Sequence, residues 1–127
     1  MHESQTSHFY LVRVTENSEF SKFLAEHYSE DDDEPISEFY GSQGEKFCDH
    51  DFMETGLRKP NTSLQEFLAP HSYADEWSEA LIQEAHTRGL EDANALIFID
   101  KREIDSPRSV KRKGVELFYV GTFEYPI

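Results

Sequence analysis

The sequence predicts an α+β domain in which a small, mostly antiparallel sheet of about three or four strands has helices packed on it. Runs of β-branched and aromatic residues occupy 8–14, 95–99 and 115–123, while apolar residues at helical spacing lie between the first run and the second. The predicted order is therefore β-α-(short helices)-α-β-β. With 127 residues and no low-complexity linker, we expect a single domain over 1–127.

The first third of the chain begins with the predicted strand and continues into a helix. Ser18 is a candidate N-cap, and apolar side chains then recur at helical spacing, which predicts a helix over about 19–28. A short helix over 36–40 is expected to end at Gly41. The next stretch, 45–59, has no clear period, and we interpret it as a short extended piece near 46–49 followed by irregular chain.

The second half carries the clearest helix. Ser63 is placed to cap a short helix over 64–68, and Ser72 is placed to cap a long one over about 73–88, which Gly89 ends. The strand 95–99 is continuously apolar, which is typical of a strand covered on both faces. The polar segment 101–114 is expected to be a long hairpin loop with a basic tip at Arg108, Lys111, Arg112 and Lys113.

Charge is the dominant feature of the composition. The chain has 26 Asp and Glu against 12 Lys and Arg, a net charge of -14, and residues 1–56 hold 14 of the acidic residues against 3 basic ones. Such a field repels nucleic acid and anionic membranes and attracts a basic partner. We therefore expect a protein partner with a basic surface, and neither nucleic acid nor a membrane.

The cysteine count and the N-terminus bear on the compartment. Cys48 is the only cysteine, so an intrachain disulfide is excluded, which favours a reducing compartment. The first seven residues are polar and lack the apolar segment of a signal peptide, and no apolar run approaches the ~18 residues of a membrane span. We expect a cytoplasmic location.

The densest set of polar side chains that can carry chemistry lies at 49–54. Asp49, His50, Asp51 and Glu54 are ligand types for a divalent metal, so a metal-dependent hydrolase is one reading. Clustered carboxylates are common in so acidic a chain, and a solvated or partner-binding surface is the favoured reading. No phosphate-binding, zinc-binding or nucleophile motif accompanies the cluster, so we expect no enzyme and no cofactor. An inert, buried thiol is the expected state of Cys48.

Several short motifs, taken in order, carry a resemblance. They are Asp49-His50-Asp51-Phe52-Met53-Glu54, Ser72-Tyr73 at a helix start, Ala93-Asn94-Ala95 before a strand, and Gly121-Thr122-Phe123-Glu124-Tyr125. Together they resemble immunity protein family twenty-two, which consists of small acidic α+β proteins of bacterial polymorphic toxin systems. The resemblance implies that the chain binds and neutralises a cognate toxin domain, often a nuclease, and implies no enzymatic activity. The basic segment near 105–113 has no counterpart in the family pattern.

The predicted partner-binding patch combines charge with aromatic side chains. Carboxylates speed association with a basic partner, and buried aromatic anchors supply most of the affinity. An acidic cytosolic adaptor with another basic protein partner fits the same features and stays an alternative. The predicted patch comprises Glu30, Asp31, Asp32, Asp33, Glu34, Phe39, Tyr40, Asp49, Asp51, Phe52 and Glu54.

Overall fold

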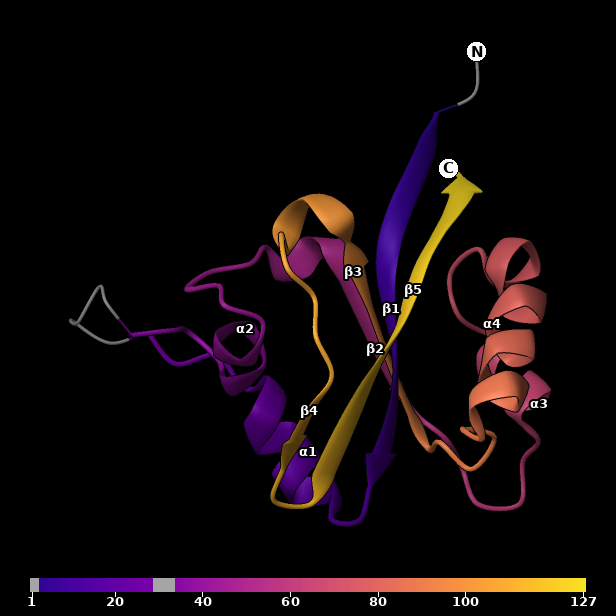
Figure 1. Cartoon of the computed structure of the whole chain (residues 1–127), viewed down its shortest axis with the longest axis horizontal. Coiled ribbons are helices and arrows are strands. Elements are labelled where there is room, and N and C mark those ends of the chain that lie inside the picture. Colours follow the sequence, from indigo (N-terminus) through magenta and orange to yellow (C-terminus); the bar gives the residue numbers. More distant parts are fainter. Residues whose placement is uncertain (1–2, 29–33) are drawn as a thin grey trace.

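The computed structural model describes residues 3–28 and 34–127. Its fold is α+β, as expected, but a strand interrupts the helices that were expected between the first two strands (Figure 1). In chain order the elements are β1 (Ser4–Val14), α1 (Asn17–Leu24), α2 (Glu38–Ser42), a 3-10 turn (His50–Phe52), β2 (Met53–Leu57), α3 (Leu64–Leu68), α4 (Ala74–Arg88), β3 (Ala95–Asp100), a second 3-10 turn (Lys101–Glu103), β4 (Val110–Arg112) and β5 (Val115–Pro126).

The sheet has five strands in the order β2-β3-β1-β5-β4, and every neighbouring pair is antiparallel. The prediction of three or four strands is therefore too low. The two strands it missed are the edge strands, whose sequences Met-Glu-Thr-Gly-Leu and Val-Lys-Arg carry few of the apolar residues that signal a strand. An edge strand has one open side, so its sequence is under weaker pressure to be apolar.

The segment 101–114 is not the predicted hairpin loop. β1 lies between β3 and β5, so this segment crosses from one side of β1 to the other. Its residues 110–112 form β4, which pairs with β5. The hairpin is therefore short, and its turn is at Lys113 and Gly114. Gly114 has a φ of 71°, the left-handed conformation that such a tight turn requires.

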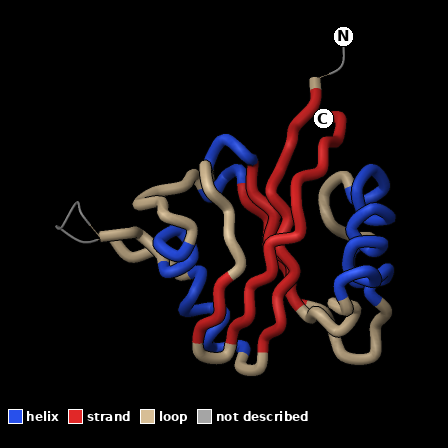
Figure 2. The backbone as a smooth tube through the Cα atoms, viewed as in Figure 1, coloured by secondary structure: helices blue, strands red, loops and turns tan. Residues whose placement is uncertain are grey.

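Helices cover both faces of the sheet, which gives three layers (Figures 1 and 2). Alternate residues of β1 point to opposite layers: Phe9 and Leu11 pack with α3 and α4, while Tyr10 and Val12 pack with α1 and α2. Every residue of β3 is buried, as expected for an apolar strand covered on both faces. Each large side chain buried in this way contributes about 1.5–3 kcal/mol.

The helix ends agree with the prediction only in part. The capping box of Ser63 and Glu66 is present at α3. At the end of α4, Gly89 is left-handed and ends the helix, as predicted, and the Leu90 amide donates to the Ala85 carbonyl. The start of α4 differs, because the cap residue is Tyr73 and not Ser72. In α1 the cap residue is Glu16 instead of Ser18, and the helix ends at Leu24, where Ala25 becomes extended.

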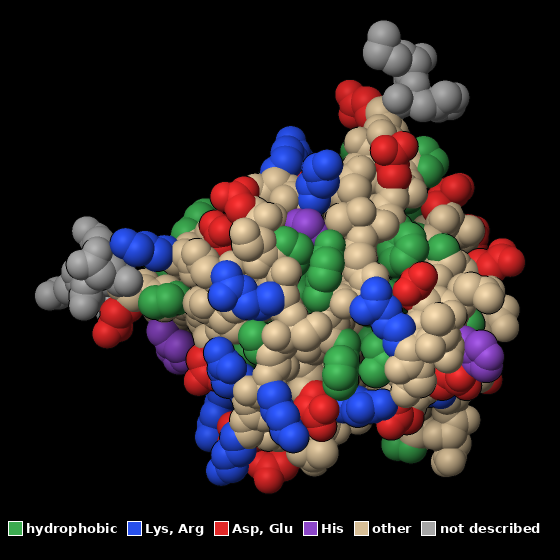
Figure 3. All heavy atoms as spheres, in the orientation of Figure 1, with side chains coloured by type: hydrophobic (Ala, Val, Ile, Leu, Met, Phe, Trp, Pro, Cys, Tyr) green, Lys and Arg blue, Asp and Glu red, His purple; other side chains and the backbone are tan. Residues whose placement is uncertain are grey.

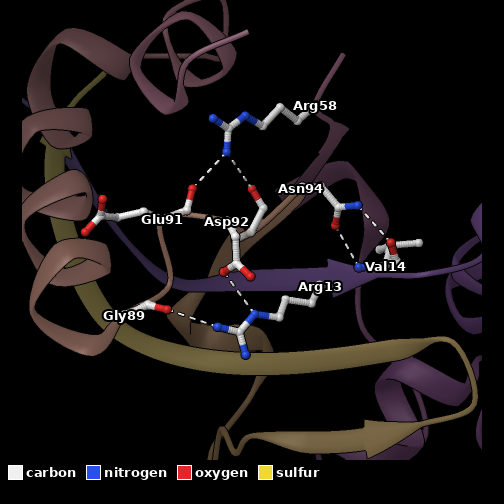
Figure 4. Close-up of polar contacts among 8 residues, drawn as sticks. Arg13, Val14, Arg58, Gly89, Glu91, Asp92 and Asn94 are labelled. Carbon is white, nitrogen blue, oxygen red and sulfur yellow. Dashed lines mark hydrogen bonds and ion pairs between the residues drawn. The ribbon is translucent and has the colours of Figure 1, made fainter. Parts of the chain in front are cut away.

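Polar contacts tie the loop 89–94 to the lower end of the sheet (Figure 4). Arg58 and Arg13 donate to groups of this loop, and the Asn94 side chain bonds both backbone groups of Val14. This end is thereby fixed, and the opposite end, where β1 begins and β5 ends, carries the candidate site (Figure 1). The contacts are Arg58 Nη1 to the carbonyls of Glu91 (2.9 Å) and Ala93 (3.1 Å), and Arg13 to Asp92 Oδ1 (3.0 Å) and the Gly89 carbonyl (3.0 Å).

Candidate partner-binding surface

A hollow opens at the upper end of the sheet, where β2 begins and the loop between α3 and α4 ends. Its volume is about 160 Å³. We call it the Phe52–Tyr73 hollow, after the two exposed aromatic residues on its rim. It is lined by Gln5, Asp51, Phe52, Met53, Glu54, Ser72, Tyr73, Phe98 and Tyr125.

The two aromatic side chains are exposed yet held in place. Phe52 is 44% exposed and Tyr73 is 49% exposed. The Tyr73 ring stacks on that of Tyr125, with centroids 5.4 Å apart and planes 24° apart. The guanidinium of Arg102 lies 5.8 Å from the centroid of the Phe52 ring. Rigid exposed aromatics lose little conformational entropy on binding, which makes them suitable anchors.

The backbone of Tyr73 is strained. Its φ of 57° and ψ of 24° are left-handed, a conformation that costs a bulky residue on the order of 1–3 kcal/mol. Hydrogen bonds on both sides hold it there: the Ala74 amide donates to the His71 carbonyl, and Trp77 Nε1 donates to the Ser72 carbonyl. Such strain concentrates at binding sites, and here it directs an aromatic side chain to the rim of the hollow.

Glu54 is fixed beneath the rim by the loop that follows α3. Its Oε2 lies 2.7 Å from His71 Nδ1 and accepts a hydrogen bond of 3.0 Å from the Ser72 amide. Burial raises the pKa of Glu54, but the hydrogen bonds from Ser72 and His71 outweigh it and bring the pKa below its ordinary value. Glu54 is therefore an ionised carboxylate that joins β2 to the start of α4.

The residues before Glu54 turn toward a different part of the molecule. Asp49 Oδ1 accepts from the Asp51 amide at 3.0 Å and so caps the 3-10 turn. His50 Nδ1 lies 2.8 Å from Glu26 Oε1, on the side of the sheet that α1 and α2 cover. The Asp51 side chain is 80% exposed.

The proposed hydrolase cluster is thus divided. His50 is directed toward Glu26, while Glu54 is directed toward His71 on the opposite face of the sheet. Within 3–28 and 34–127, no group of three or more His, Cys, Asp or Glu side chains is arranged to hold a metal ion. The four side chains do not converge as that alternative requires.

The expectation that Phe39 and Tyr40 are surface anchors is wrong. Both have no exposed surface, because α2 packs its aromatic side chains into the sheet against Tyr10 and Phe23. The hydroxyl of Tyr40 is also engaged, donating to Glu26 Oε2 at 3.2 Å. Periodicity alone did not separate these rings from exposed ones, because α2 is only five residues long.

Tyr73 is the residue that the predicted patch lacked. The sequence offers one signal for it, an aromatic residue directly before the apolar helical stripe that starts at Ala74. An aromatic residue just outside that stripe is a candidate for exposure. The left-handed backbone that orients it has no signal in the sequence, since Gly or Asn is the usual residue there.

The acidic run of the predicted patch lies mostly outside the described residues. Glu30 to Asp33 lie outside the described residues, whereas Glu34 is described and exposed.

Cys48 is fully buried, and its Sγ donates to the Glu103 carbonyl at 3.4 Å. Burial, followed by the nearby Glu45, Glu103 and Glu26, raises the pKa of its thiol to about 12. The expected inert thiol agrees with this environment.

The predicted basic tip lies over β4 and the turn that follows it. Arg108, Lys111, Arg112 and Lys113 are all exposed, and Figure 3 shows Lys and Arg side chains concentrated over β4 and its turn. Lys113 Nζ lies 3.9 Å from Glu19 Oε1, so part of this segment pairs with the acidic half of the chain. The basic side chains over β4 therefore lie beside acidic ones of the same surface.

Comparison with known proteins decides the family. The model of the family described as Immunity protein 22 matches residues 8–126. The chain belongs to the Immunity protein 22 family. No curated protein and no solved structure matches it. None of the helices in the described parts of the chain is both long enough and apolar enough to cross a membrane.

Proposed function

We propose that this chain is an immunity protein that binds a cognate bacterial toxin domain and neutralises it without catalysis, through the Phe52–Tyr73 hollow and the carboxylates around it. The observation that carries the proposal is the pair of exposed, fixed aromatic rings on the rim of a hollow that Asp51 and Glu54 also line. Aromatic anchors in a small depression, surrounded by charge, are the usual composition of a tight interface.

The net charge of -14 supports a basic toxin, and a nuclease is the class that it fits best. A nuclease presents Lys and Arg to phosphates, and an acidic protein placed there excludes the nucleic acid. Charges of opposite sign also raise the association rate, which matters for an inhibitor that must act before the toxin does. Toxin and immunity protein would meet in the cytoplasm.

The proposed contact residues revise the sequence-based patch in two ways. Phe39 and Tyr40 are removed because they are buried, and Tyr73 is added because it is exposed beside Phe52. Phe47, whose ring is exposed, is a further, peripheral candidate. The remaining carboxylates are retained: Glu30, Asp31, Asp32, Asp33, Glu34, Asp49, Asp51 and Glu54.

The test begins with recovery of the partner from the native cell by co-purification with this chain. The recovered toxin domain is then titrated with the wild-type chain and with Phe52→Ala, Tyr73→Ala and, as the control, Gln83→Ala. Gln83 is exposed on α4, away from the hollow. We expect each aromatic substitution to weaken binding by tenfold or more, about 1.4 kcal/mol, and the control to have no effect. Equal affinity of all four proteins would contradict the placement of the site.

The hydrolase reading predicts a different result. A metal-dependent enzyme would contain stoichiometric metal or would gain thermal stability when manganese, zinc or calcium is added. For the inhibitor we expect a shift of less than a degree with each ion. A reproducible, saturable shift that Asp51→Asn abolishes would contradict the proposal.

A further inference from the structure

We infer that the toxin supplies an extended segment that pairs with β2 as a sixth strand of the sheet. This inference rests on the proposed function, because it takes the toxin as the partner and extends the contact from the Phe52–Tyr73 hollow along the neighbouring edge. Strand addition gives affinity through the main chain and specificity through alternate side chains.

The hydrogen-bond pattern shows which groups of β2 face outward. The Arg58 amide donates to the Asn94 carbonyl at 2.7 Å, so Arg58 faces β3. In an antiparallel pair of strands, residues that are hydrogen-bonded to the partner strand alternate with residues that are not. Because Arg58 is hydrogen-bonded to β3, Leu57 and Thr55, which lie opposite Ala95 and Ile97, are not. The N–H and C=O of Thr55 and Leu57 therefore point away from β3. In the parts of the chain that the structure describes, no hydrogen bond reaches these four groups.

Other exposed stretches of edge in this sheet carry features that discourage pairing. β4 is only three residues long and presents Lys111 and Arg112, a short basic edge of the kind that prevents aggregation. In β5 the register shifts where Phe9 pairs with Gly121 and Tyr10 with Tyr119, which makes Val120 a bulge. β2 has neither a bulge nor a Lys within its five residues.

A groove beside β2 provides a place for a side chain of the added strand. It has a volume of about 290 Å³ and lies between the edge of β2 and α3. Gly56 forms part of its floor, where the His71 ring packs so closely that a Cβ on Gly56 would lie 2.5 Å from it. The rings of Phe67 and Pro70 make the walls apolar, so the groove fits an apolar side chain of moderate size.

Charge favours the basic toxin as the occupant over a second copy of this chain. The start of β2 leads directly to Asp51 and the hollow, whereas Glu66 and Lys59 of opposite charge both line the groove. A segment with an apolar residue over Gly56 and a Lys or Arg near Asp51 would be complementary at both points. Two copies would instead bring together molecules with a net charge of -14 each.

The main-chain pairing is tested with Thr55→Pro and its matched control Thr55→Ala. Proline removes the outward N–H and blocks an added strand, yet it disturbs no bond to β3, and edge strands tolerate it at such positions. Alanine retains the N–H. We expect both variants to unfold within a few degrees of each other, and Thr55→Pro to bind the recovered toxin domain at least tenfold more weakly than Thr55→Ala.

Hydrogen exchange provides a readout that does not depend on a variant. The amides of Thr55 and Leu57 should exchange rapidly in the free protein and be protected in the wild-type complex with the toxin domain. If the wild-type chain neutralises the toxin but these amides stay unprotected and both Thr55 variants bind alike, the strand pairing is wrong and the proposed function stands. If no toxin domain is recovered or neutralised, the proposed function fails, and the pairing fails with it. A free protein that sediments as a dimer, and as a monomer only after Thr55→Pro, would assign the edge to a second copy and overturn the inference.

Discussion

At the residue scale, the site depends on a few side chains whose contacts determine their orientation. Glu54 holds the loop that presents Tyr73, and Tyr73 adopts a strained backbone against Tyr125. The sequence pattern named Glu54, Asp51 and Phe52 as candidates because polar and aromatic residues cluster there, and the structure places all three around the hollow. It could not separate Phe52 from Phe39, since exposure depends on how each short element packs.

The carboxylate of Glu54 makes a pH-dependent contribution to stability. Its pKa in the folded state is below the unfolded value of about 4.3, so the contribution is present above that pH and is lost as the pH falls through the folded pKa. Glu54→Gln should lower the free energy of unfolding by about 1 kcal/mol at pH 7, a modest figure because the side chain is 30% exposed and screened by solvent. Denaturant unfolding at pH 7 and pH 3 should show the difference shrinking at the lower pH. A constant difference would mean that the charge of Glu54 contributes nothing.

Tyr73 permits strain to be separated from binding. Tyr73→Ala must keep the left-handed backbone, whereas Tyr73→Gly adopts it freely. The glycine variant should therefore be the more stable of the two by about 1 kcal/mol, although both lose the ring that we propose contacts the toxin. Thermal unfolding and toxin binding should be measured on the same preparations. If the alanine variant is the more stable, the strain assigned to Tyr73 is wrong.

At the scale of elements, the three central strands were predictable and the two edge strands were not. β1, β3 and β5 are apolar because helices cover them, and that burial is what a sequence pattern records. β2 pairs on one side only. Its sequence gives no clear strand pattern because its three central residues are Glu54, Thr55 and Gly56. The helix ends followed the same logic: Gly89 and the Ser63 cap act locally and were predicted, while the cap at Tyr73 depends on tertiary contacts.

The fit between β2 and the loop after α3 is close enough to test by adding one methyl group. Gly56→Ala places a Cβ 2.5 Å from the His71 ring, which must move and disturb its contact with Glu54. We expect a loss of about 1–3 kcal/mol in the free energy of unfolding. Thr55→Ala, one residue earlier and exposed, is the matched control and should cost far less. Equal losses for the two variants would show that the ring can move without cost.

At the scale of the whole molecule, the polar contacts that fix the sheet and the hollow lie at opposite ends. The lower end of the sheet is fixed by Arg13, Arg58 and Asn94, and basic residues gather over β4, while the hollow and its carboxylates occupy the opposite end. The composition gives the net charge of -14 directly. It did not predict which aromatic rings would be exposed, because that follows from the folding of all three layers.

The acidic field should determine how fast the toxin binds. Replacing Asp31, Asp32 and Asp33 together with Asn should slow association several-fold at low salt and have less effect near 0.5 M salt, where the Debye length is only ~4 Å. Stopped-flow or surface-based kinetics across a salt series measures this directly. Dissociation should change little. An association rate that is independent of salt would contradict an electrostatic role for the run.

The central claim is that the chain neutralises a toxin by occupying it, and titration of activity tests this most directly. The toxin domain recovered from the native cell is assayed on its substrate at a fixed concentration well above the dissociation constant, while the chain is added in steps. We predict that activity falls linearly to zero at one equivalent of the wild-type chain and that Phe52→Ala needs a clear excess. Full toxin activity in the presence of several equivalents of wild-type chain would contradict the account.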